Sequence, residues 1–228
     1  MLKAVIFDLD GVLINSEPLM RFAFEASYRQ VIGAGAPPTE TYLEHMGESF
    51  PRIMDHLKLP HTLWEPYRKI CQENLDLVTV FPESRRLLER LKSMRMKLSL
   101  LTGKDRARTL QTLEYFDLLE FFDEVIASDQ LRFPKPNPEG ILLALELMNC
   151  APEEAVMIGD AVNDILCAQR AGVPSVAVTW GIRPELVQTL CEPNHIVHKW
   201  DELQHLLLDM RQGGESLAEV AKTTGTNA

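Results

Sequence analysis

The stretch that decides the fold is Ala4-Val5-Ile6-Phe7-Asp8-Leu9-Asp10-Gly11-Val12-Leu13. Four apolar residues run directly into two aspartates, and a glycine follows the second. A continuous apolar run of this kind predicts a strand buried on both faces, as in a parallel sheet. Open parallel sheets carry their chemistry at the carboxyl ends of the strands, which is where Asp8 and Asp10 stand. Two carboxylates this close repel each other, so the site needs a divalent cation or unequal protonation.

The composition is typical of a folded protein with a substantial core. The chain has 228 residues, of which 46% are hydrophobic and 25% charged. No basic run offsets the net charge of -10, which argues against nucleic-acid binding. The N-terminal apolar run is too short for a signal peptide or a membrane span. The cysteines lack Cys-x-x-Cys spacing, so we expect free thiols and a cytoplasmic protein.

Beyond the first strand the chain changes character twice. Helical patterns without any strand-like run fill the first part, with helices expected at 17–31, 39–46, 50–57 and 61–75. From Pro82 onward, helices expected at 83–94, 106–115, 138–148, 164–171 and 201–210 alternate with strands expected at 97–101, 124–127, 155–158, 175–178 and 195–197. This alternation predicts an α/β fold, a Rossmann-like parallel sheet with helices on both faces.

The same pattern divides the chain into three parts. Residues 1–15 and 81–211 are expected to form the Rossmann-like core. Residues 16–80 form an α-helical cap inserted after the first strand, which we expect to lie over the strand ends. Residues 212–228 are small and polar, and we expect a flexible tail with a short helix at 216–222.

Three later strand ends carry polar residues that complement the two aspartates. Thr102-Gly103 offers a hydroxyl and exposed backbone N–H groups, a combination that suits an anion. Prolines on both sides of Lys135 fix the backbone around it. Gly159 permits close backbone approach to a ligand, and Asp160 and Asp164 lie four residues apart at a helix start. Each feature alone is also typical of a helix cap or a surface loop.

Together these groups suit phosphoryl transfer. Mg²⁺ binds through one or two carboxylates plus substrate phosphate, and Asp8 and Asp160 can supply the carboxylates. Thr102 and Lys135 can neutralise the phosphate oxygens. Asp8 can attack phosphorus and form an aspartyl-phosphate, while Asp10 acts first as acid and then as base. The predicted function is a Mg²⁺-dependent phosphatase that hydrolyses a small phosphorylated metabolite.

Four motifs carry a family resemblance. Asp8-Leu-Asp-Gly-Val-Leu, Leu101-Thr-Gly-Lys, Lys135-Pro-Asn-Pro and Gly159-Asp-Ala-Val-Asn-Asp164 resemble, in this order, those of the haloacid dehalogenase superfamily. The resemblance implies that Asp8 is the nucleophile and Asp10 the general acid and base. It further implies that Thr102, Gly103 and Lys135 bind phosphate, and that the Mg²⁺ site comprises Asp8, Asp10 through its backbone carbonyl, Asp160 and Asp164. Asp164 would touch the cation or one of its ligands.

The segment after the first motif resembles the small cap of this superfamily, which excludes water and selects the substrate. The chain is similar to phosphoglycolate phosphatases and β-phosphoglucomutases, and residues 31–38 and 46–52 look most like phosphatases associated with aminohydroxybenzoate biosynthesis. Candidate selectivity residues on the cap are Arg21, His45, Glu48 and Arg52. Arg52 is the strongest, because a guanidinium can pair with an anionic substrate group.

Three alternatives stay open at this point. A phosphomutase is weakened because Met20-Arg21 stands where the mutase places a histidine. A 2-haloacid dehalogenase would need neither Asp10 nor Mg²⁺. A receiver-like signalling module with Asp8 as phosphate acceptor would be shorter and would lack the cap. In each case we expect a monomer or weak homodimer.

Overall fold

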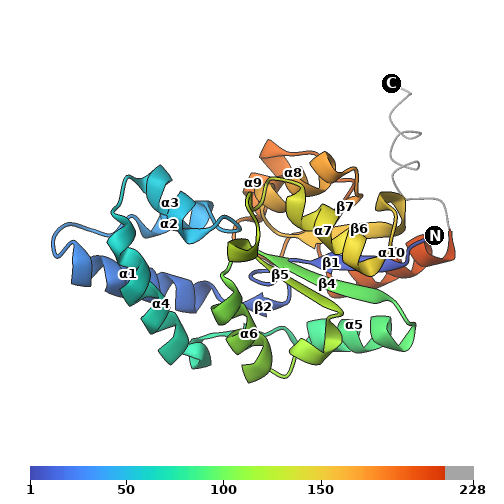
Figure 1. The fold of residues 1–228 in the computed structure, drawn as a ribbon, viewed down its shortest axis with the longest axis horizontal. Coiled ribbons are helices and arrows are strands. Elements are labelled where there is room, and N and C mark those ends of the chain that lie inside the picture. Colours follow the sequence, from blue (N-terminus) through green and yellow to red (C-terminus); the bar gives the residue numbers. More distant parts are fainter. Residues whose placement is uncertain (214–228) are drawn as a thin grey trace.

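The central sheet has six parallel strands in the order β5-β4-β1-β6-β7-β8 in the computed structural model, which describes residues 1–213 (Figure 1). The strands are β1 (Ala4–Phe7), β4 (Lys97–Thr102), β5 (Glu124–Ala127), β6 (Ala155–Gly159), β7 (Ser175–Val178) and β8 (His195–Val197). The strand β1 pairs with β4 on one side and β6 on the other. The chain reverses its direction of winding at β1, and such a switch point is where α/β sheets bind ligands.

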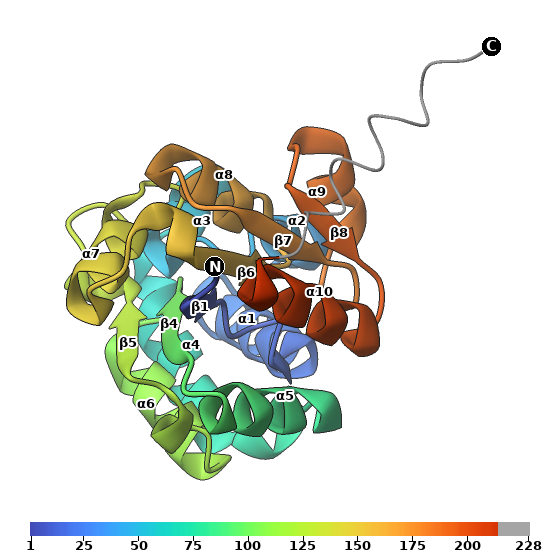
Figure 2. The same ribbon diagram turned by 90° about the vertical axis from the view of Figure 1, so that its right-hand side faces the viewer.

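Helices cover both faces of the sheet, as Figure 2 shows, so the predicted α/β fold is confirmed. On one face lie α5 (Pro82–Ser93) and α10 (Trp200–Gln212), and on the other lie α7 (Glu139–Met148) and α8 (Val162–Ala171). Side chains of β1 alternate between the two layers. Val5 and Phe7 belong to the hydrophobic cluster that includes α5 and α10, whereas Ala4 and Ile6 belong to the cluster formed with α7 and α8.

Residues 16–80 contain α1 (Glu17–Val31), α2 (Thr39–Glu44), α3 (Phe50–Leu57) and α4 (Trp64–Glu73). These helices lie beyond the carboxyl ends of the strands, at the left of Figure 1. A two-stranded antiparallel ribbon of β2 (Ile14–Asn15) and β3 (Thr79–Val80) joins the two ends of this segment. The sequence did not indicate the ribbon, because strands of two residues are too short to show a period.

The remaining helices differ from expectation mainly at their ends. The helix expected at 61–75 is broken into a 3-10 turn (His61–Leu63), α4 and a second 3-10 turn (Leu75–Leu77). Helix α6 (Arg106–Tyr115) is as expected, whereas α9 (Pro184–Leu190) was missed, since Val187 is its one buried side chain. The expected tail helix at 216–222 lies outside the described residues. Within residues 1–213, no helix is both long and apolar enough to cross a membrane.

Candidate functional site

The carboxyl ends of three adjacent strands bring the predicted site residues together. Asp8 directly follows β1, Thr102 ends β4, and Asp160 directly follows β6. The Asp8 backbone N–H donates to the carbonyl oxygen of Ile158 at 2.9 Å, which continues the ladder between β1 and β6. Because the strands are parallel and neighbouring, residues far apart in the chain meet at one edge of the sheet.

Three buried carboxylates and one ammonium form the centre of the site. We call these four groups, Asp8, Asp160, Asp164 and Lys135, the catalytic cluster. One oxygen from each aspartate lies within 4.8 Å of the others. Lys135 Nζ lies 3.0 Å from Asp8 Oδ1 and 2.5 Å from Asp164 Oδ1. When all three acids are ionised, the single ammonium leaves two negative charges uncompensated.

The electrostatics of the catalytic cluster favour an added cation. The pKa of Asp8 is raised to about 7. Burial is the main cause, Asp164 and Asp10 add to the increase, and Lys135 opposes it. Burial also raises the pKa of Asp160 well above its ordinary value, with Asp8 and Asp164 adding to the effect. Burial alone would lower the pKa of Lys135, but Asp164 and Asp8 together raise it.

The ligand atoms also fit a divalent cation. Lys135 is at ion-pair distance from Asp8 Oδ1, yet among residues 1–213 no group donates a well-aligned hydrogen bond to this buried oxygen. Carboxylate oxygens are the ligands that hard cations such as Mg²⁺ prefer. The residues present can therefore hold a divalent metal ion at the strand ends.

Two glycines make room for Asp160. A Cβ atom on Gly11, whose φ is +79°, would lie 2.0 Å from Asp160 Oδ2, and one on Gly181 would lie 2.2 Å from it. The missing side chain of Gly11, in the first motif, thus leaves room for the carboxylate of Asp160 in the fourth motif. The expectation that Gly159 admits a ligand is wrong in detail, because a Cβ there would lie 2.2 Å from Asp164 Cβ, so the Asp164 side chain fills this space.

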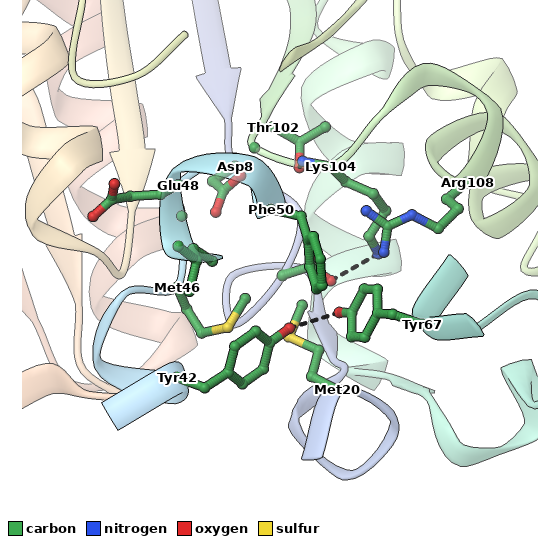
Figure 3. A pocket seen from close by; sticks show the side chains of 14 residues that line it. Asp8, Met20, Tyr42, Met46, Glu48, Phe50, Tyr67, Thr102, Lys104 and Arg108 are labelled. Carbon is green, nitrogen blue, oxygen red and sulfur yellow. Dashed lines mark hydrogen bonds and ion pairs between the residues drawn. The ribbon is translucent and has the colours of Figure 1, made fainter. Parts of the chain in front are cut away.

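A small cavity opens beside Asp8, between the strand ends and the cap helices (Figure 3). Its polar side contains Asp8, Asp10, Thr102, Gly103, Lys104 and Arg108. Its opposite side is mostly apolar and aromatic and is formed by Met20, Tyr42, Met46, Phe50, Ile53 and Tyr67. The hydroxyls of the two tyrosines lie 2.7 Å apart and hydrogen-bond to each other.

Two cations in this cavity were missed by the sequence analysis. Lys104 Nζ donates to Asp10 Oδ1 at 2.9 Å, and its backbone N–H donates to Thr102 Oγ1 at 3.2 Å. The Arg108 guanidinium lies over the rings of Trp64 and Tyr67, 4.9 and 5.3 Å from their centroids. Lys104 is the last residue of the second motif, Leu101-Thr-Gly-Lys, and Arg108 stands four residues later, a spacing that could have identified both.

The four selectivity candidates do not lie together in the cavity. Glu48 is part of its lining, although Figure 3 shows the Glu48 carboxylate pointing away from the cavity centre. His45 and Arg52 pair with that carboxylate at 3.2 and 2.8 Å and lie outside the lining. Arg21 is also outside it, because on α1 it pairs with Glu17 one turn earlier and with Glu40.

Comparisons with known proteins agree with this geometry. The family model of haloacid dehalogenase-like hydrolases matches residues 5–178. A phosphorylated carbohydrates phosphatase from Thermotoga maritima is 35% identical over 184 residues, which cover 77% of this chain and 84% of the relative. The pyrophosphatase PpaX from Bacillus velezensis is 31% identical over 211 residues, which cover 89% of this chain and 95% of the relative.

A solved structure gives the same result at the level of the fold. A haloacid dehalogenase-like hydrolase from Streptococcus pneumoniae has a TM-score of 0.78 and 27% identity, and the match covers 90% of this chain and 97% of that one. The predicted superfamily and the predicted enzyme class, a hydrolase of the phosphatase type, are thereby confirmed. The chain belongs to the haloacid dehalogenase-like hydrolases.

Proposed function

We propose that this enzyme is a Mg²⁺-dependent phosphatase that hydrolyses a small phosphorylated metabolite through an aspartyl-phosphate on Asp8. The proposal rests mainly on the surroundings of Asp8. This residue lies beside the cavity, and Lys135 and Asp160 lie close to its carboxylate. A carboxylate held among a fixed ammonium and two further acids is suited to attack phosphorus once a cation offsets the negative charge.

The cation would be held by Asp8, Asp160 and the backbone carbonyl of Asp10. Mg²⁺ bound there would neutralise charge on the phosphate oxygens. Asp164 has a different part in this proposal. Its Oδ1 accepts from Lys135 Nζ at 2.5 Å and its Oδ2 accepts from the Ala161 N–H at 3.1 Å, so both oxygens are already engaged within the protein. Asp164 therefore positions Lys135, which in turn faces Asp8.

In the first step a carboxylate oxygen of Asp8 bonds to phosphorus and the ester P–O bond breaks. The leaving oxygen takes a proton from the carboxyl group of Asp10. In the second step Asp10 takes a proton from water, the water oxygen bonds to phosphorus, and the bond between phosphorus and Asp8 breaks. Inorganic phosphate leaves, and both side chains return to their starting states.

The cavity indicates the class of substrate. It lies directly beside Asp8, so a substrate whose phosphate reacts at Asp8 would place its remaining atoms against the cavity lining. Lys104 and Arg108 offer positive charge beyond the reacting phosphate, and the aromatic side offers a surface for a ring or a carbon chain. We therefore place the substrate among phosphomonoesters of small metabolites that carry a second polar or anionic group. The names of the relatives add sugar phosphates and pyrophosphate to the panel to be tested.

The test is phosphate release from p-nitrophenyl phosphate and from a panel of sugar phosphates, phosphoglycolate and pyrophosphate. We expect turnover with Mg²⁺, loss with a chelator, and a fall of roughly 10³-fold or more in kcat for Asp8→Asn. The matched control is Asp209→Asn, which changes an exposed aspartate on α10 in the same way and should leave kcat unaltered. An Asp8→Asn protein with wild-type activity would refute the proposal.

A further inference from the structure

We propose that the cap carries a second metal site, for a transition ion of the Zn²⁺ class, formed by His45, Glu48 and His56. We call these three residues the lid cluster. His45 follows the last residue of α2, Glu48 lies in the loop before α3, and His56 lies within α3. Their three ligand atoms lie within 4.8 Å of one another, and the Glu48 carboxylate points away from the centre of the cavity (Figure 3).

The distances match a tetrahedral metal site. Nδ1 of His45 lies 3.1 Å from Nδ1 of His56, and Oε1 of Glu48 lies 3.2 Å from the first nitrogen and 3.5 Å from the second. Zinc bonds of roughly 2.0 to 2.1 Å in a tetrahedron place neighbouring ligand atoms about 3.3 Å apart. The three atoms already outline one face of that tetrahedron, and two imidazoles with one carboxylate are a ligand set that zinc accepts.

Hydrogen bonding alone does not account for this triangle. Each of the three atoms, at any moment, either donates a proton or accepts one. Among three mutually touching atoms, two must then share the same role, whichever tautomers the histidines adopt. One edge of the triangle therefore always sets two donors or two acceptors against each other. A metal ion removes the conflict, because all three atoms then direct lone pairs at the cation.

Burial of the carboxylate adds an independent observation. The Glu48 side chain is only 7% exposed, and its second oxygen, Oε2, lies 2.8 Å from Arg52 Nε, which leaves Oε1 directed at the two imidazoles. The histidine side chains are 31% and 39% exposed, so an ion can reach the lid cluster from solvent and keep a water as its fourth ligand. Arg52 would hold the carboxylate in place, as outer partners of metal ligands do.

The location gives the site a consequence for the cavity. Met46, Gly47 and Glu48 line the cavity, and the same loop touches the core. A Cβ on Gly103 would lie 2.6 Å from the Gly47 carbonyl oxygen, and one on Gly47 would lie 2.9 Å from Ala161 Cβ. A metal that ties the end of α2 to α3 would fix the conformation of this loop, which lines the cavity.

The experiment measures Zn²⁺ binding by isothermal titration calorimetry and Co²⁺ binding by visible absorption, both in millimolar Mg²⁺. The protein variants are wild type, His56→Ala and the control His61→Ala, which removes another exposed cap histidine. His61 pairs with Asp55 and is not part of the lid cluster. Any Zn²⁺ taken up by the catalytic cluster is common to all three proteins, so the difference reports the lid cluster alone.

We expect wild type and His61→Ala to bind one more Zn²⁺ than His56→Ala, or to bind it roughly 100-fold more tightly, since even outer partners of a metal ligand can be worth that much. Co²⁺ should give tetrahedral d–d bands in the first two proteins only. With Mg²⁺ alone, His56→Ala should retain the wild-type turnover rate. Equal Zn²⁺ stoichiometry and affinity in all three proteins would overturn the proposal, whatever the enzymatic activity proves to be.

Discussion

The catalytic cluster and the lid cluster are two separate groups of potential metal ligands, one at the ends of the sheet strands and one on the cap. The catalytic cluster is fully buried and lies at the ends of sheet strands, and its possible metal ligands are all carboxylate oxygens. The lid cluster is half exposed, offers two nitrogens and one oxygen and lies at helix ends on the cap. Oxygen ligands suit Mg²⁺, whereas imidazole suits borderline ions such as Zn²⁺.

The two clusters also differ in how they are balanced without metal. In the catalytic cluster Lys135 is a built-in counter-charge that contacts two of the three acids. The lid cluster contains no such group among its three members, and the nearby Arg52 reaches only the far oxygen of Glu48. The difference shows that the protein itself offsets part of the charge in the first cluster, whereas the three members of the second include no counter-charge.

The largest expected effect comes from removing that counter-charge. Lys135→Met leaves buried carboxylates facing each other and should lower the free energy of unfolding by about 3 kcal/mol in metal-free buffer. It should also lower kcat roughly 100-fold or more, because a fixed charge at the reacting group is lost. Urea unfolding and phosphate release measure the two effects.

The control is Lys92→Met, which removes an exposed ion pair with Asp123 and should cost less than about 1 kcal/mol. Excess Mg²⁺ should reduce the stability difference between Lys135→Met and wild type and leave the difference between Lys92→Met and wild type unchanged. Equal losses in the two variants would remove the distinction drawn between a balanced and an unbalanced cluster.

A second prediction concerns pH and the catalytic cluster. The folded-state pKa of Asp8 is about 7, above the ordinary value of 3.8, so the unfolded chain loses this proton at lower pH than the folded one. The metal-free protein should therefore lose stability as pH rises from about 4 to 7. Mg²⁺ binding must displace the same proton, so its affinity should rise by up to about tenfold per pH unit below 7 and then level off.

Thermal melts with and without Mg²⁺ from pH 5 to 8.5 measure both trends. Asp8→Asn should weaken both trends, leaving the part that comes from Asp160, whose pKa burial also raises. A wild-type Mg²⁺ affinity that does not change across this interval would contradict the assignment of Asp8 to the cation site.

The smallest expected effect separates the two possible roles of Arg52. If Arg52 holds the Glu48 carboxylate in place for the lid cluster, Arg52→Ala should weaken Zn²⁺ binding roughly tenfold, with KM unaltered. If it binds substrate, as the sequence suggested, KM should rise instead. Calorimetry with Zn²⁺ and initial-rate kinetics decide between them, with Arg29→Ala, another exposed cap arginine, as the control.

The catalytic cluster could be predicted because each of its residues belongs to a short, continuous sequence motif. An apolar run ending in Asp8 marks a strand end locally, and the runs that end at Thr102 and Ile158 do the same. The lid cluster could not be predicted in this way. His45 and His56 are 11 residues apart on different elements, and their contact depends on how α2 and α3 are arranged.

The sequence alone determined the alternating α/β architecture and the strand ends at which the acids gather, because hydrophobic periodicity acts over neighbouring residues. Only the tertiary structure decided that Asp164 pairs with Lys135, that Lys104 reaches Asp10 and that Glu48 points away from the cavity. The direction of a side chain is set by the charges and the space that other elements leave for it, and no local pattern contains that information.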